Sequence, residues 1–174
     1  EYVDNTWENF SASATGQSDD RLMLVSAGTE NKDVSHSKSE FAFNSYFGRF
    51  EYNLDRKYYF DFSLRQDASS RFGRDNQTAT FWATGVMWDM KKEDFLANND
   101  LVSSMNLKFS IGTSGNSEIA NYGHLALVGS TQYQNSTGWL ISTPGNPALS
   151  WESQTKATVG LDFALVDDRY RISL

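Results

Sequence analysis

The sequence predicts an all-β fold in which antiparallel, up-and-down strands form part of a transmembrane β-barrel, with one or two short helices in the loops. Apolar and polar side chains alternate through the segment 57–67, KYYFDFSLRQD, and the alternation returns in 105–113 and 157–165. Alternation with period two places the two sets of side chains on opposite faces of a strand. A membrane barrel turns the apolar face to lipid and the polar face to a wet lumen.

Composition excludes several classes of function. The chain has 174 residues, which suits one domain, and its 15 basic and 22 acidic residues give a net charge of −7. This balance argues against a nucleic-acid-binding protein, which needs a basic face to neutralise phosphates. The chain lacks cysteine, which excludes disulfides, thiolate zinc sites and cysteine nucleophiles. His36 and His124 lie far apart, and we interpret both as surface residues, so we expect neither a metal nor another cofactor.

Along the chain, the pattern predicts two short helices and about six strands. The segment 21–27, RLMLVSA, has helical spacing and follows the capping candidates Ser-Asp-Asp at 18–20. The segment 92–97, KEDFLA, suits a helix of one or two turns. Strands are expected at 40–53, 58–67, 78–89, 105–113, 156–166 and from 169 onward.

The strand at 78–89 is apolar on both faces and allows two interpretations. Trp82 and Trp88 share one face, whereas Phe81 and Met87 share the other. In a soluble sandwich, such a strand is buried on both sides. In a membrane, the two tryptophans would lie near the two interfaces, because their spacing spans about 20 Å and the apolar band of a barrel is about 25 Å tall.

The connections between strands differ in length at the two ends of the sheet. Tight turns are expected at 54–57 and 166–169, and the link 90–104, which holds the short helix, lies at the same end. At the opposite end lie 68–77 and the much longer 114–155. Short turns at one end and long loops at the other are typical of outer-membrane barrels, whose turns face the periplasm.

Ordered motifs along the chain carry a family resemblance. The segment 45–76 contains YFGR and, after the next strand, RQDASSRFG, in which Gln and Ala replace a common Arg and Gly. TSGNSEIANY at 113–122 follows, and then 145–174, which contains NPALSWE and GLDFAL. ENFSASATGQSDDRLMLVSAGT, near the start, is similar to the loop that precedes the YFGR strand. Together these motifs resemble the SusC/RagA family of TonB-dependent outer-membrane transporters.

The resemblance implies a fold and a function. Members of the family are barrels of about 22 strands closed by an N-terminal plug, and they import nutrients such as oligosaccharides or peptides with energy from TonB. Residues 1–174 are then expected to be a partial β-barrel segment of about six strands, with no plug domain present, from the C-terminal half of a protein of the cell outer membrane. The alternation continues to the last residue, which also predicts a piece of a longer chain.

The resemblance also implies partners. Through the full-length protein, the chain is expected to work with TonB and with a SusD-like surface lipoprotein that acts as a lid. It is expected to meet an oligosaccharide or peptide cargo and outer-membrane lipid, but no nucleic acid. An isolated segment has open sheet edges and an uncovered apolar face, so we expect it to self-associate.

Charged side chains on the polar strand faces are candidates for a lumen wall. In the expected register, the lumen-facing residues are Asp61, Arg65, Lys108, Lys156 and Asp162. Opposite charges on adjacent strands pair across the ladder, so bracing of the wall is the simpler interpretation and lining of a substrate path the alternative. A glycosidase requires two carboxylates at a fixed separation, and nothing in the spacing selects such a pair. We therefore expect no catalytic residue and no enzyme.

Three loop residues are candidates for contact with substrate or lid: Arg71, Phe72 and Trp139. The alternative for Arg71 and Phe72 is a loop held by its own Arg–Asp pairs and by a turn at Gly73. Trp139 stands in the long loop, where its flat ring suits a sugar. Asn135 begins a glycosylation sequon, which we interpret as a chance match.

Two other classes of protein remain open at this point. A soluble carbohydrate-binding β-sandwich would use the same alternation, with its apolar faces packed on each other. An adhesin or autotransporter wall would also be a barrel. The sandwich requires inward packing of the apolar residues of two strands, whereas a barrel requires that they point outward. The residues are Tyr58, Phe60, Phe62, Leu64, Met105, Leu107, Phe109 and Ile111.

Overall fold

The computed structural model describes residues 1–134 and 136–174, so Asn135, the first residue of the sequon, lies outside the described residues. The strands are β1 (Tyr2–Thr15), β2 (Glu30–Leu54), β3 (Tyr58–Ser69), β4 (Thr78–Asp89), β5 (Val102–Asn116), β6 (Leu127–Tyr133), β7 (Ser136–Thr143), β8 (Glu152–Leu165) and β9 (Tyr170–Ser173). The helical turns are η1 (Val25–Ala27), η2 (Arg74–Asn76), η3 (Met90–Lys92) and α1 (Asp94–Ala97).

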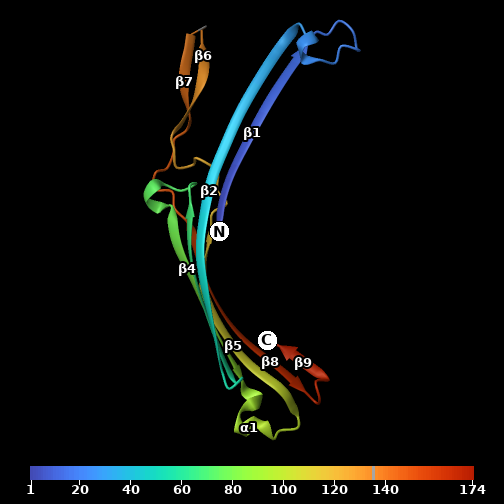
Figure 1. Ribbon diagram of the computed structural model, residues 1–174, viewed down its shortest axis with the longest axis vertical. Coiled ribbons are helices and arrows are strands. Elements are labelled where there is room, and N and C mark those ends of the chain that lie inside the picture. The colour runs from blue at the N-terminus through green and yellow to red at the C-terminus, as the bar shows by residue number, and fades with distance from the viewer. Residues whose placement is uncertain (135) are drawn as a thin grey trace.

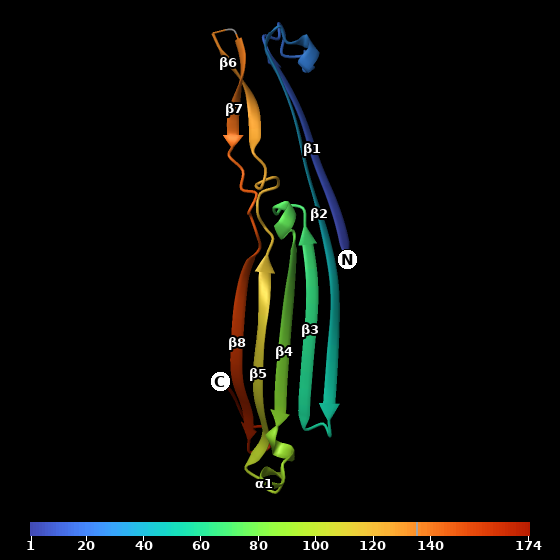
Figure 2. The same cartoon turned by 90° about the vertical axis from the view of Figure 1, so that its left-hand side faces the viewer.

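The strands form one curved layer and one projecting ribbon (Figure 1). An antiparallel sheet of seven strands has the order β1-β2-β3-β4-β5-β8-β9, and β6 pairs with β7 in a two-stranded sheet. Neighbours in the sheet are neighbours in sequence apart from the β6–β7 ribbon, which is inserted between β5 and β8. Figure 2 shows β2, β3, β4, β5 and β8 side by side, with the outer part of β1–β2 extending well beyond the others.

This architecture confirms the all-β, antiparallel prediction. The strand expected at 78–89 coincides with β4, and the other expected strands overlap β2, β3, β5, β8 and β9. The expected count of about six strands is low, because β1 also belongs to the main sheet. The strands of the β6–β7 ribbon were not expected within the long loop either.

The helix expected at 21–27 is wrong apart from the single turn η1. The Asp19 carboxylate accepts hydrogen bonds from the backbone N–H of Arg21 at 2.9 Å and from its guanidinium Nε at 2.8 Å. Such a local side-chain bond offers the backbone a turn in place of a helix. The second expected helix is present as η3 followed by α1. No described helix is long and apolar enough to cross a membrane.

The register divides the sheet into an apolar and a polar face. One row across four strands is Phe50, Phe62, Thr84 and Ile111, and the adjacent row is Glu51, Asp61, Gly85 and Ser110. Six of the eight diagnostic apolar residues are 37–47% exposed, namely Tyr58, Phe60, Phe62, Leu64, Leu107 and Phe109. Met105 and Ile111 are half-buried. None of the described elements packs across this face (Figure 1), so the sandwich interpretation is wrong for the described part of the chain.

Aromatic side chains border the apolar face at its short-turn end. Tyr58 and Trp88 lie opposite each other in register and stack with ring centroids 6.3 Å apart. The Glu93 carboxylate accepts hydrogen bonds from the Tyr58 hydroxyl at 2.6 Å, the Trp88 indole N–H at 3.0 Å and the Lys57 ammonium at 3.0 Å. Aromatic rings with an apolar body and a bonded polar tip suit the boundary between hydrocarbon and water.

Glu93→Gln is expected to remove a pH dependence from this end of the sheet. Hydrogen bonds from Tyr58, Lys57 and Trp88 lower the pKa of Glu93 below its ordinary value of 4.5. The carboxylate therefore contributes stability that is fully present above pH 4.5 and is lost as the pH falls through the lowered pKa. In the full-length protein, the fluorescence of Trp88, isolated by subtracting the signal of Trp88→Phe, should report this transition.

The neighbouring carboxylate supplies the control for that measurement. Asp94→Asn neutralises an adjacent residue that does not bond Tyr58 or Trp88, and we expect it to keep the acid transition. If Glu93→Gln showed the same transition as the unsubstituted protein, the assignment to Glu93 would be wrong.

At the long-loop end, aromatic rings fill a gap in the sheet. β4 pairs with β5 only over its second half, so the first half lacks that neighbour. The Trp151 ring lies 4.7 Å from the ring of Phe72 and 5.6 Å from that of Phe81, measured between centroids. Its indole N–H donates to the carbonyl of Gln77 at 3.0 Å. Phe72 is 0% exposed, which makes this cluster the centre of the small core.

Gly73 allows two loops to meet beside that core. Its N–H donates to the carbonyl of Leu149 at 3.0 Å. A Cβ at this position would lie 1.9 Å from the carbonyl oxygen of Pro147, a contact with backbone that no rotamer relieves. Because Gly73 has no side chain, the β3–β4 loop can lie directly against the segment that enters β8.

The isolated chain is expected to self-associate in water. β1 and β9 each leave one edge unpaired in the described sheet, and the apolar face is uncovered, so both edge pairing and face contact are available. Light scattering without detergent should give a mass well above 19.6 kDa, and a mild detergent should lower it. A stable monomer without detergent would contradict this expectation.

Candidate functional site

The polar face of the sheet brings together the residues that the sequence suggested for a lumen wall. Asp61, Arg65, Lys108, Lys156 and Asp162 share this face in the observed register. The Lys108 ammonium forms an ion pair with the Asp162 carboxylate across β5 and β8. Asp61 lies over Gly85, where a Cβ would be only 2.5 Å from its Oδ1. The wall therefore combines cross-strand pairs with close-fitting small residues.

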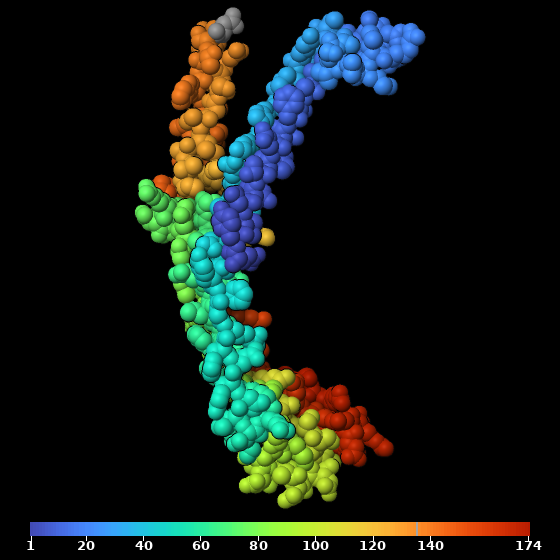
Figure 3. Space-filling model, in the orientation of Figure 1, coloured from blue at the N-terminus to red at the C-terminus, as the bar shows by residue number. Residues whose placement is uncertain are grey.

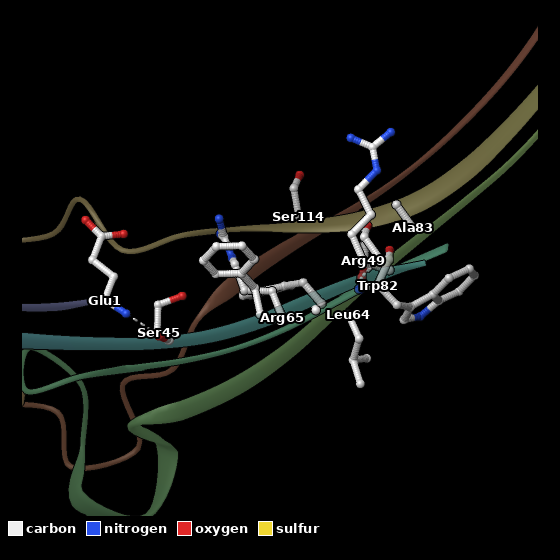
Figure 4. A pocket seen from close by; sticks show the side chains of 13 residues that line it. Glu1, Ser45, Arg49, Leu64, Arg65, Trp82, Ala83 and Ser114 are labelled. Atoms are coloured by element: carbon white, nitrogen blue, oxygen red, sulfur yellow. Dashed lines mark hydrogen bonds between the residues drawn. The ribbon is translucent and has the colours of Figure 1, made fainter. Parts of the chain in front are cut away.

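A shallow hollow of about 480 Å³ lies where β2, β3, β4 and β5 adjoin (Figure 4). In this view, Arg49, Ala83 and Ser114 point to one side of the sheet, whereas Leu64 and Trp82 point to the other. The face with Arg49 and Ser114 also carries the rings of Phe47 and Phe81, so the polar face is partly aromatic around this hollow.

Arg65 stands between two aromatic rings in this part of the wall. It is opposite Phe47 on β2 and Phe81 on β4, and its guanidinium carbon lies 5.9 Å from the Phe81 ring centroid, within cation–π range. Its Nη2 lies 2.8 Å from Oδ2 of Asp67, which is 0% exposed. The Ser45 hydroxyl donates to the other carboxylate oxygen at 2.6 Å. Because a buried charge is costly without its partner, we assign Arg65 a bracing role.

Of the two loop candidates, Phe72 is buried and Arg71 is half-buried. Phe72 has no exposed surface, so its suggested contact with substrate or lid is wrong and it acts in packing. The Arg71 guanidinium donates to the Asn121 side-chain oxygen at 2.7 Å and to the Ser117 carbonyl at 3.0 Å, and it lies 3.9 Å from the Phe41 ring centroid. The loop is therefore secured by an amide, a carbonyl and a ring instead of the expected Arg–Asp pairs.

Trp139 lies on the projecting β6–β7 ribbon and is 82% exposed. In the register of this ribbon, Trp139 shares a face with Val128 and Ile141, which are 55% and 69% exposed. No charged residue occurs in the sequence from Leu125 to Thr143. Figure 3 shows the ribbon standing apart from the outer part of β1–β2. The structure therefore presents Trp139 on an uncharged, accessible surface.

The chemical groups of these surfaces suit binding. The described residues contain no group of three or more histidine, aspartate or glutamate side chains arranged for a metal ion. Ion pairs, hydroxyls, amides and aromatic rings predominate instead, and these groups hold or orient a solute.

Sequence reasoning missed β1 and its exposed Trp7. Trp7 is 56% exposed and lies opposite Ser39 of β2. In the segment 2–15, successive side chains point to opposite faces, but apolar and polar residues are not separated between the two faces. The apolar–polar alternation that predicted the other strands is therefore absent. The signal that could have found it is the recurrence of uncharged polar residues at every second position around Trp7, namely Asn5, Asn9, Ser11 and Ser13.

Comparisons with known proteins give one consistent result. The chain is 35% identical over 133 residues to TonB-dependent receptor P3 of Formosa agariphila, a match of 74% of this chain and 13% of that receptor. It is also 35% identical over 133 residues to TonB-dependent receptor SusC of Bacteroides thetaiotaomicron, or 72% of this chain and 13% of that receptor. A solved structure of the RagAB peptide transporter matches with a TM-score of 0.90 and 40% identity over 99% of this chain and 20% of that chain. No family model matches the chain.

These matches decide the class of protein. The relatives are receptors and transporters, which confirms the prediction that the chain is not part of an enzyme. The chain spans about an eighth of the curated receptors and about a fifth of the solved one. Sequence identity and fold agree over that span, so the chain belongs to the SusC/RagA family of TonB-dependent receptors of the outer membrane.

Proposed function

We propose that this chain forms part of the barrel wall of a TonB-dependent transporter that imports nutrients such as oligosaccharides or peptides. The observation that carries the proposal is the two-faced sheet. Its apolar face is continuous and uncovered, and its polar face holds ion pairs, hydroxyls and amides. Lipid on one side and a wet lumen on the other satisfy both faces at once.

The two ends of the sheet give the wall an orientation. The turns after β2 and β8 are short, and Glu93 anchors the aromatic border at this end, which we assign to the periplasm. The long loops and the β6–β7 ribbon lie at the other end (Figure 1), which we assign to the cell exterior. In this orientation, Asp61, Arg65, Lys108, Lys156 and Asp162 face the lumen.

The partners follow from the same orientation and act through the full-length protein. We propose that TonB supplies energy from the periplasm and that a SusD-like lipoprotein covers the exterior opening. The uncharged ribbon surface with Trp139 is the part of this chain that we assign to contact with that lid. A solvent-exposed indole in an apolar patch is a typical anchor at such contacts.

Uptake by living cells tests the transport proposal. A strain without the full-length receptor and a strain without TonB should both lose uptake of the same labelled oligosaccharide or peptide, and the receptor gene should restore it in the first strain. Unchanged uptake of every tested nutrient in the receptor-deficient strain would overturn the proposal.

A further inference from the structure

The outer part of the β1–β2 hairpin carries an uncharged strip that the wall does not use. In the register, the residues on this face are Val3, Asn5, Trp7, Asn9 and Ser11 of β1 and Ser35, Ser37, Ser39 and Phe41 of β2. We propose that these residues, the Trp7 strip, bind a neutral oligosaccharide as cargo. The proposal deepens the transport function proposed above and rests on it.

The charges of the hairpin are sorted onto the opposite face. The Glu8 carboxylate there lies 2.7 Å from Nε2 of His36, and Lys38 forms an ion pair with Glu40. The first charged side chain on the Trp7 strip is Asp33, which lies beyond Ser11 toward the tip of the hairpin. Apart from the Arg71 guanidinium, which covers the Phe41 ring at one end, no residue of the strip brings a charge between Val3 and Ser11. An uncharged surface of this length is complementary to a solute without charge.

The remaining groups of the strip match the surface of a sugar chain. Serine hydroxyls and asparagine amides each donate and accept hydrogen bonds, as sugar hydroxyls do. Trp7 is 56% exposed and supplies a rigid, flat apolar surface for the C–H face of a pyranose ring. A peptide would bring charged termini and side chains, whereas the one charge that lies against the described strip residues, on Arg71, is already engaged by Asn121 and the Ser117 carbonyl. Neutral oligosaccharide is therefore the occupant that the observations favour.

Side chains of the loop residues Asn121 and Tyr122 bond to β2 at the end of the strip that lies nearest to β3. The Asn121 amide donates to the Ser39 hydroxyl at 2.7 Å, and the Tyr122 hydroxyl accepts the backbone N–H of Glu40 at 2.8 Å. The Arg71 guanidinium at this end is engaged by the Asn121 side-chain oxygen and by the ring of Phe41. Trp7 lies directly opposite Ser39, at the level of this loop, and remains 56% exposed. Beyond it, the outer part of β1–β2 stands apart from the β6–β7 ribbon (Figure 3), so a chain-like solute can approach the strip from the side.

Binding to the full-length receptor, purified in detergent, tests the proposal. Titration calorimetry would use a panel of neutral hexasaccharides (gluco-, xylo-, manno- and galacto-configured) and a neutral blocked hexapeptide. We expect at least one hexasaccharide to bind, and Trp7→Ala to weaken that binding about tenfold, because aromatic stacking and burial of the ring are both lost. Asn9→Asp, which keeps the indole but adds a charge to the strip, should also weaken it.

The matched control is another exposed aromatic residue of the same strand. Phe10 is 68% exposed and lies on the charged face, so Phe10→Ala should bind like the unsubstituted receptor. Equal binding by Trp7→Ala and the unsubstituted receptor, or equal losses in Trp7→Ala and Phe10→Ala, would overturn the proposal. Binding of the peptide alone, or of no member of the panel, would overturn the assignment of the occupant.

Uptake separates this proposal from the one on which it rests. Loss of uptake without the receptor, combined with normal binding by Trp7→Ala, would leave the transport function standing and refute the strip. Normal uptake without the receptor would refute the transport function itself.

Discussion

Phe62→Arg is expected to impair assembly of the full-length receptor in the outer membrane. Phe62 lies in the middle of the apolar face, opposite Phe50 and Thr84, and is 37% exposed in the described sheet. An arginine facing lipid near the bilayer midplane costs about 2–4 kcal/mol. The amount of heat-modifiable barrel in outer-membrane fractions, together with urea unfolding in vesicles, should show the loss.

The same substitution on the other face controls for the added charge. Ser110 lies at a similar depth, because Ser110 pairs with Gly85 and Phe62 with Thr84, the adjacent residue of β4. Ser110→Arg points to the polar face near Asp61, and we expect near-normal assembly. Equal defects in both variants would show that the assignment of lipid and lumen faces is wrong.

Phe72→Ala is expected to release the exterior loops from the sheet. Phe72 is fully buried against Trp151, and truncation of a buried phenylalanine costs about 3–5 kcal/mol, including the cavity that remains. Hydrogen exchange of the full-length receptor should show faster exchange in peptides that cover 69–78 and 143–151. Peptides from the middle of β3 should be unchanged, because the ladder there does not depend on this ring.

An exposed phenylalanine provides the comparison. Phe95 in α1 is 65% exposed, so Phe95→Ala should leave exchange in the exterior loops at the level of the unsubstituted receptor. If exchange in both loops stayed as slow in Phe72→Ala as in the unsubstituted receptor, the hydrogen bonds of Gly73 and Trp151 would be sufficient to hold the loops.

The sequence was most informative where the two faces of a strand differ in polarity. Around Phe60, Asp61 and Phe62, side-chain polarity reports the face directly, and β4 was predicted with its observed bounds. The shared face of Asp61 and Asp162 also followed from alternation alone, because strand parity is local and survives errors at the strand ends.

The parts that escaped prediction lie outside the apolar band. On the outer part of β1–β2 and on the β6–β7 ribbon, apolar and polar side chains occur on both faces. The alternating direction of the side chains therefore brings no alternation between apolar and polar residues. Phe72 was misjudged for a different reason. Its burial depends on Trp151, almost eighty positions away, and on the point at which β4 and β5 separate, which no local pattern encodes. Contacts of this kind arise from tertiary packing.

The length of β2 has a consequence for how the receptor meets its surroundings. Its 25 residues span about 80 Å at roughly 3.3 Å per residue, whereas an apolar band of about 25 Å suffices to cross the membrane. In the orientation proposed above, most of the remainder, stiffened by its ladder with β1, forms an arm that carries the segment 16–29 away from the membrane. We expect that tip to be among the first parts of the receptor that antibodies and phages encounter, and to vary among strains more than the wall beneath it.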